Sequence, residues 1–135
     1  MPLDAERTLI LLVEDDVLQR IAAHDLLVEA GHDVAEASSA VDALGWLLGR
    51  PDVAAIITDI DMPGPLDGAD LVRILAAIAP QTPIIVISAT SNAPAGVFRH
   101  LPKPYFPGDL LDAVEAALIA CKAPDADRRR EDWRP

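Results

Sequence analysis

A short run near the middle of the chain ends in two carboxylates that could do chemistry. Residues 55–59 form an apolar, largely β-branched stretch, which favours a strand buried on both faces of a parallel sheet. Asp59 ends the stretch, and Asp61 follows shortly before the break at Pro63-Gly64. Ligands of open α/β sheets gather at the carboxyl ends of the strands. Asp59 is therefore the candidate reacting group.

The same pattern of a buried strand followed by polar side chains recurs along the chain. Because the carboxyl ends of parallel strands meet at one edge of a sheet, we expect these side chains to converge. In chain order, the strand ends carry Glu14 and Asp15, then Asp59, then Ser88, and finally Lys103.

Three converging carboxylates would repel one another unless a cation joined them. Hard oxygen ligands of this number favour Mg²⁺. A lysine beside them supplies a compact positive charge, and a serine supplies a hydrogen-bond donor. These are the groups that phosphoryl transfer to a carboxylate requires: a nucleophile, a metal and donors to the phosphoryl oxygens.

Alternating strand and helix patterns must position this constellation. The predicted strands are 8–13, 32–37, 55–59, 83–88 and 97–101, and the predicted helices are 17–30, 39–48, 67–78 and 110–118. This alternation predicts an α/β fold with a doubly wound, five-stranded parallel sheet. Only Ala89–Gly96 separates the fourth and fifth strands. That segment is shorter than a typical helix of about 11 residues with its connections, so we expect the fourth helix to be shortened or replaced by a loop.

Five short motifs make the chain similar to the receiver domains of two-component response regulators over about residues 8–122. They are Leu12-Val13-Glu14-Asp15-Asp16, Thr58-Asp59-Ile60-Asp61-Met62-Pro63, Asp67-Gly68, Ile87-Ser88-Ala89 and Leu101-Pro102-Lys103-Pro104. The resemblance implies a flavodoxin-like receiver fold with strand order 2-1-3-4-5. It also implies a module that catalyses only its own phosphorylation and dephosphorylation and is not otherwise an enzyme.

The resemblance assigns a role to each site residue. It implies that Asp59 accepts a phosphoryl group from a phosphohistidine on a sensor histidine kinase or a histidine phosphotransfer protein. Asp15, Asp59 and the backbone carbonyl of Asp61 would ligate Mg²⁺, and Glu14 would act through a metal-bound water. Ser88 and Lys103 would bind the phosphoryl oxygens.

Four features depart from the family pattern. His100 stands three residues before the lysine, where the family commonly has an aromatic switch residue, so His100 is either a modified switch or a packing residue. The loop 62–68 is one residue longer than usual, the fourth helix is reduced, and we expect no effector domain to follow. We therefore expect a stand-alone regulator with a receiver at 1–122 and a polar, disordered tail at 123–135, which signals through an unknown output protein.

Charge and composition limit the classes of partner and the compartment that we expect for this protein. The formal net charge of −11 argues against binding to nucleic acid or to an anionic membrane. One cysteine, Cys121, fits a reducing compartment, and no apolar stretch is long enough to span a bilayer. These features predict a cytoplasmic protein.

Other interpretations remain open at this point. The chain could be a pseudo-receiver that only binds proteins, or a haloacid-dehalogenase-type phosphatase, whose nucleophile and acid are also two residues apart. Singly, Asp59 could be a solvated strand end, Ser88 a strand terminator and Lys103 a surface residue. The side chains of Asp16 and Asp61 fit loop acids or helix N-caps better than metal ligands.

Overall fold

A parallel sheet of five strands forms the centre of the structure. The computed structural model describes residues 8–49, 52–62, 68–89 and 94–132, with side chains described up to residue 120. The elements within these residues are β1 (Leu9–Val13), α2 (Val17–Glu29), β2 (Asp33–Ala37), α3 (Ala40–Gly49), β3 (Val53–Asp59), α4 (Gly68–Ile78), β4 (Ile84–Ser88), β5 (Arg99–Pro102) and α5 (Pro107–Asp132). The strand order is β2-β1-β3-β4-β5 and every pair is parallel. The predicted doubly wound sheet and its strand order are confirmed.

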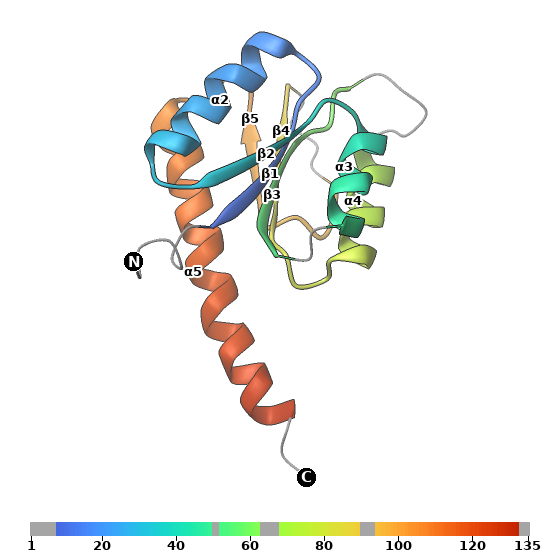
Figure 1. Ribbon diagram of the computed structural model, residues 1–135, viewed down its shortest axis with the longest axis vertical. Coiled ribbons are helices and arrows are strands. Elements are labelled where there is room, and N and C mark those ends of the chain that lie inside the picture. Colours follow the sequence, from blue (N-terminus) through green and yellow to red (C-terminus); the bar gives the residue numbers. More distant parts are fainter. Residues whose placement is uncertain (1–7, 50–51, 63–67, 90–93, 133–135) are drawn as a thin grey trace.

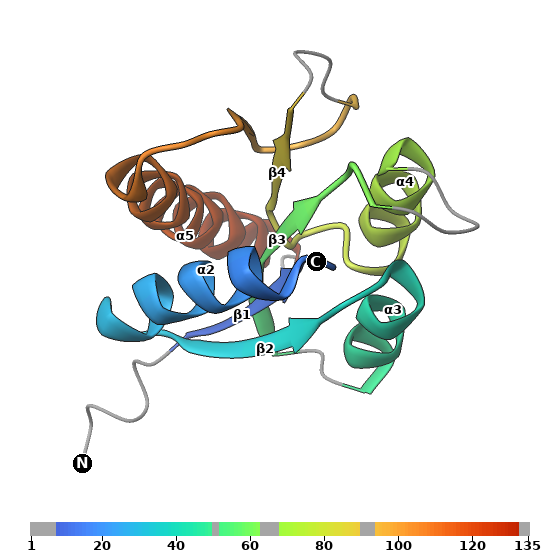
Figure 2. The same ribbon diagram turned by 90° about the horizontal axis from the view of Figure 1, so that it is seen from above.

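Helices cover both faces of the sheet (Figure 1). The view from above shows α2 and α5 on one face and α3 and α4 on the other (Figure 2). Neighbouring residues of one strand therefore enter different cores: Leu12 packs with the α2–α5 cluster and Leu11 with the α3–α4 cluster. Because side chains alternate along a strand and both faces are buried, β1 and β3 must be apolar at nearly every position.

The connection between β4 and β5 is short, as the sequence predicts. Among its described residues, Ala89 and 94–98, none is helical. Residues 90–93, which belong to the same predicted loop, lie outside the described residues. Within its described residues, the chain thus has one helix fewer than a regular alternation of strands and helices would give.

The last helix is longer than the sequence suggests. Helix α5 continues to Asp132, whereas the sequence favours a disordered tail from residue 123. Alanine and arginine are strong helix formers, and they occupy five of the ten positions 123–132, which lets an existing helix propagate past Pro124. The second half of α5 extends away from the sheet (Figure 1). No described helix, α5 included, combines the length and the apolar character needed to cross a membrane.

Candidate functional site

The carboxyl ends of four strands bring the predicted site residues to one edge of the sheet. Glu14 and Asp15 directly follow β1, Asp59 is the last residue of β3, and Ser88 is the last residue of β4. Lys103 directly follows β5. Glu14 and Asp59 are only 5% and 3% exposed, which is unusual for carboxylates and requires compensating charge.

Lys103 supplies that charge. Its Nζ lies 2.6 Å from Asp59 Oδ2 and 3.6 Å from Glu14 Oε1. Burial by itself would lower the pKa of Lys103. The hydrogen bond and charge of Asp59, with the charge of Glu14, outweigh burial and raise the pKa above its ordinary value. The ammonium group therefore stays protonated and pairs with the candidate acceptor.

Three carboxylates lie close to one another at this edge of the sheet, and two of them, Glu14 and Asp59, face the Lys103 ammonium group. One carboxylate oxygen from each of Glu14, Asp15 and Asp59 lies within 4.8 Å of the other two. Burial raises the pKa of the Glu14 carboxyl from its ordinary 4.5 to about 7, and the charge of Asp59 adds to the shift. The Asp16 N–H, which donates to Glu14 Oε2, acts in the opposite direction. By themselves, these carboxylates carry more negative charge than Lys103 neutralises.

This donor set fits a hard divalent cation. All three groups offer carboxylate oxygens, which Mg²⁺ prefers to nitrogen or sulfur. A divalent ion would also counteract the burial and the charge of Asp59, which together raise the pKa of Glu14. The predicted acids Glu14, Asp15 and Asp59 are the residues that could hold Mg²⁺ here.

Asp61 has a different role from that of a side-chain ligand. Its backbone N–H donates to Asp59 Oδ1 at 2.8 Å, and its carboxylate Oδ2 accepts from the Ala89 N–H at 2.7 Å. The first bond fixes the oxygen of Asp59 that Lys103 does not bind. The second ties the strand end of β3 to the residue that follows β4, so the Asp61 side chain is a loop acid.

Ser88 and His100 meet across β4 and β5. Parallel pairing places His100 beside Val86 and Pro102 beside Ser88, and the Ser88 Oγ lies 3.0 Å from His100 Nε2. Ser88 is fully buried and His100 is half-buried. His100 therefore does more than pack, because its imidazole is hydrogen-bonded to a site hydroxyl.

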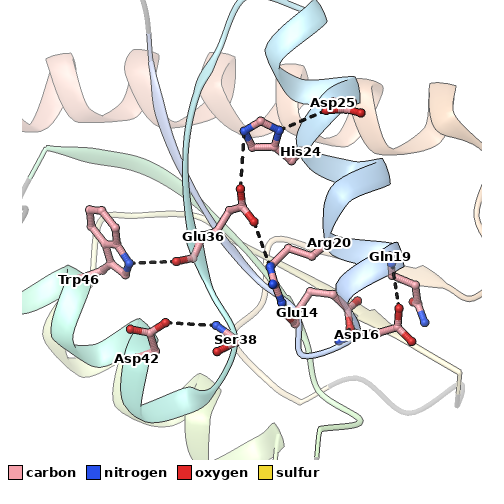
Figure 3. Close-up of polar contacts among 10 residues, drawn as sticks. All are labelled: Glu14, Asp16, Gln19, Arg20, His24, Asp25, Glu36, Ser38, Asp42 and Trp46. Atoms are coloured by element: carbon pink, nitrogen blue, oxygen red, sulfur yellow. Dashed lines mark hydrogen bonds and ion pairs between the residues drawn. The ribbon is translucent and has the colours of Figure 1, made fainter.

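The sequence did not single out Arg20, which the structure brings to the site. Arg20 Nη1 donates to the backbone carbonyl of Glu14 at 2.8 Å. Asp16 caps the same helix, since its Oδ1 accepts from the Gln19 N–H at 2.9 Å, so its expected role as an N-cap is confirmed. Figure 3 shows these residues around the start of α2. An arginine one turn into the helix that follows an acidic loop was the only available signal.

Comparison with known proteins identifies a family. Residues 10–115 match the family model of the response regulator receiver domain. The chain is 34% identical over 125 residues to a DNA-binding transcriptional regulator, NtrC, of Azospirillum brasilense, covering 87% of this chain and 25% of the relative. It is equally identical to the response regulator MprA of Mycobacterium leprae, covering 87% of this chain and 54% of the relative. The chain thus spans from a quarter to about half the length of these relatives.

Solved structures agree with the sequence matches. A receiver domain protein of Clostridium thermocellum superposes with a TM-score of 0.79 at 28% identity, covering 85% of this chain and 97% of the other. These matches contradict the phosphatase alternative, because residues 10–115 match the receiver domain, which is a phospho-acceptor signalling module rather than an enzyme.

Proposed function

The chain belongs to the family of response regulator receiver domains, and on that premise we propose that Asp59 accepts a phosphoryl group in a Mg²⁺-dependent reaction. A receiver is a phospho-acceptor signalling module of a two-component system, not an enzyme. The observation that carries the proposal is the meeting of Glu14, Asp15 and Asp59 within 4.8 Å, with Lys103 at 2.6 Å from Asp59.

The Asp59 carboxylate is held in a fixed orientation before the reaction. Lys103 binds Oδ2 and the Asp61 N–H binds Oδ1, so the group loses little further freedom when a donor arrives. A carboxylate oxygen attacks phosphorus, an O–P bond forms, and the P–N bond of the phosphohistidine breaks. The departing imidazole keeps the bonding electron pair and takes up a proton. A Mg²⁺ ion, when bound, would neutralise part of the negative charge on the phosphoryl oxygens.

Two donors serve the phosphoryl group once it is attached. Lys103 pairs with one phosphoryl oxygen, and Ser88 turns its hydroxyl towards another. His100 then responds, because its Nε2 shares the Ser88 hydroxyl. We propose that this change biases the Ala89–Gly96 loop, of which residues 90–93 lie outside the described residues, and thereby alters a protein-binding surface.

The partners follow from this chemistry. The donor is a sensor histidine kinase or a histidine phosphotransfer protein. The output is a changed protein–protein interaction, a phosphorelay step or a phosphate sink competing for a shared kinase. The net charge of −11 disfavours nucleic acid and anionic membranes as partners. The DNA-binding activity named for the Azospirillum relative is not carried over, because only 25% of that protein is matched. We propose a cytoplasmic location.

Phosphotransfer tests the proposal. A phosphorylated histidine kinase is incubated with the wild type, with Asp59→Asn and with Asp70→Asn, which removes a carboxylate from the surface of α4. The wild type and Asp70→Asn should label in Mg²⁺ and lose labelling in EDTA, and Asp59→Asn should not label. Equal labelling of Asp59→Asn would refute the proposal. Amide spectra that do not respond to Mg²⁺ with beryllofluoride would instead indicate a pseudo-receiver.

A further inference from the structure

One short loop carries two of the three acids of the cation site. Glu14 and Asp15 lie between the end of β1 and the start of α2, so the path of this backbone decides where their carboxylates lie. The Glu14 N–H is held by the Ala37 carbonyl of β2 at 2.9 Å. The Glu14 carbonyl belongs to neither β1 nor α2, and its hydrogen-bond donor is a side chain.

Arg20 is that donor. Its guanidinium donates from Nη1 to the Glu14 carbonyl at 2.8 Å and from Nε to Glu36 Oε1 at 2.9 Å. The side chain is only 18% exposed, and Figure 3 shows it lying between the acidic loop and the edge strand β2. One planar group therefore joins the loop to an element outside the site, with its two bonds fixed relative to each other.

Glu36 is itself held from two sides. The Trp46 Nε1–H of α3 donates to the Glu36 backbone carbonyl at 3.0 Å. On the α2 side, His24 Nε2 lies 3.7 Å from Glu36 Oε2 (Figure 3). The anchor that Arg20 uses is thus positioned by two helices on opposite faces of the sheet.

We propose that Arg20 is a positioning residue for the cation site, which holds the Glu14 carbonyl so that Glu14 and Asp15 present their oxygens to the same ion as Asp59. This inference rests on the proposed Mg²⁺ site. Groups that orient metal ligands without touching the metal commonly change affinity by about 10- to 100-fold when removed.

The direction in which Mg²⁺ affinity changes distinguishes a positioning role of Arg20 from an effect of its charge alone. By Coulomb's law, removing a positive guanidinium near a cation site should strengthen cation binding. Positioning predicts the reverse, because the loop loses its fixed carbonyl. Arg20→Lys sharpens the contrast: it keeps the charge but cannot form both bonds of the rigid fork.

Calorimetric Mg²⁺ titration of the metal-free protein measures this directly. Arg20→Gln and Arg20→Lys should each weaken Mg²⁺ binding by about tenfold. The matched control is Arg73→Gln on α4, which removes an equal charge from a side chain that is 70% exposed and paired with Asp70. That control should bind Mg²⁺ like the wild type. In the variants, the amide resonances of Glu14 and Asp15 should shift before any metal is added.

Two results of the Mg²⁺ titration would overturn the proposed role of Arg20. Mg²⁺ affinity in Arg20→Gln that equals or exceeds that of the wild type would overturn the inference, as would wild-type affinity in Arg20→Lys. Thermal unfolding checks that the variants are folded, and Arg20→Lys, which retains the charge and the aliphatic stem, carries the test if Arg20→Gln does not fold. A wild type that binds Mg²⁺ but accepts no phosphoryl group would refute the proposed function and leave this test valid.

Discussion

Replacing Glu14 with glutamine should stabilise the metal-free protein above neutral pH, although it removes a site residue. The pKa of the Glu14 carboxyl is raised by burial from 4.5 to about 7. The native state therefore binds this proton more tightly than the unfolded state does. Stability from the neutral carboxyl is fully present below about pH 4.5 and is lost as the pH rises through about 7. Glutamine stays neutral throughout.

The size of the gain follows from the two pKa values. At about 1.36 kcal/mol per pH unit, the interval from 4.5 to about 7 corresponds to about 3 kcal/mol of unfolding free energy. Glu14→Gln should thus exceed the wild type by about 3 kcal/mol near pH 8 and by less than about 1 kcal/mol near pH 5. Free Mg²⁺ at 100 times the dissociation constant of the wild type adds about 2.7 kcal/mol to the wild type. It adds less to Glu14→Gln, whose site has one carboxylate fewer, so Mg²⁺ should narrow this difference.

Urea denaturation across this pH range, in EDTA and in Mg²⁺, provides the assay. Glu115→Gln is the control, because Glu115 lines a cavity with Thr8 and His32 near the other end of β1, away from the acidic site. Its unfolding free energy should follow the wild type at every pH. A Glu14→Gln difference that is independent of pH, or a loss of stability near pH 8 in EDTA, would refute the reasoning.

Three further changes give measurable results. Lys103→Met leaves Asp59 without its 2.6 Å partner, so the unfolding free energy in EDTA should fall by about 1–3 kcal/mol while Mg²⁺ binds more tightly; unchanged stability would contradict this. Asp61→Ala should speed amide hydrogen exchange at Ala89, whereas Asp61→Asn, which keeps an acceptor oxygen, should change it less. Equal exchange rates in the two variants would argue against the hydrogen bond between the Ala89 N–H and the Asp61 carboxylate. Asp16→Ala removes the N-cap of α2 and should cost about 1 kcal/mol by thermal unfolding, with Asp16→Ser close to the wild type.

Local patterns in the sequence were enough to predict the fold and the place of the acidic site. Apolar runs identify strands because a parallel sheet is buried on both faces, and the shared edge of the strand ends follows from topology. For this reason the sequence by itself predicts that Asp15, Asp59 and Lys103 lie together. The one clear difference in the fold is α5, where propagation of an existing helix outweighs the proline and the charged composition that indicated a tail.

The tertiary structure alone decided which side chains bind one another. Arg20 and Glu36 are sixteen residues apart, and Ser88 and His100 are twelve apart, so no local pattern records either pair. Strand register sets the second pair, and the packing of α2 against β2 sets the first. The sequence determined which chemical groups reach the edge of the sheet. Their hydrogen bonds depend on side-chain directions within a fraction of an ångström, which only the packed structure fixes.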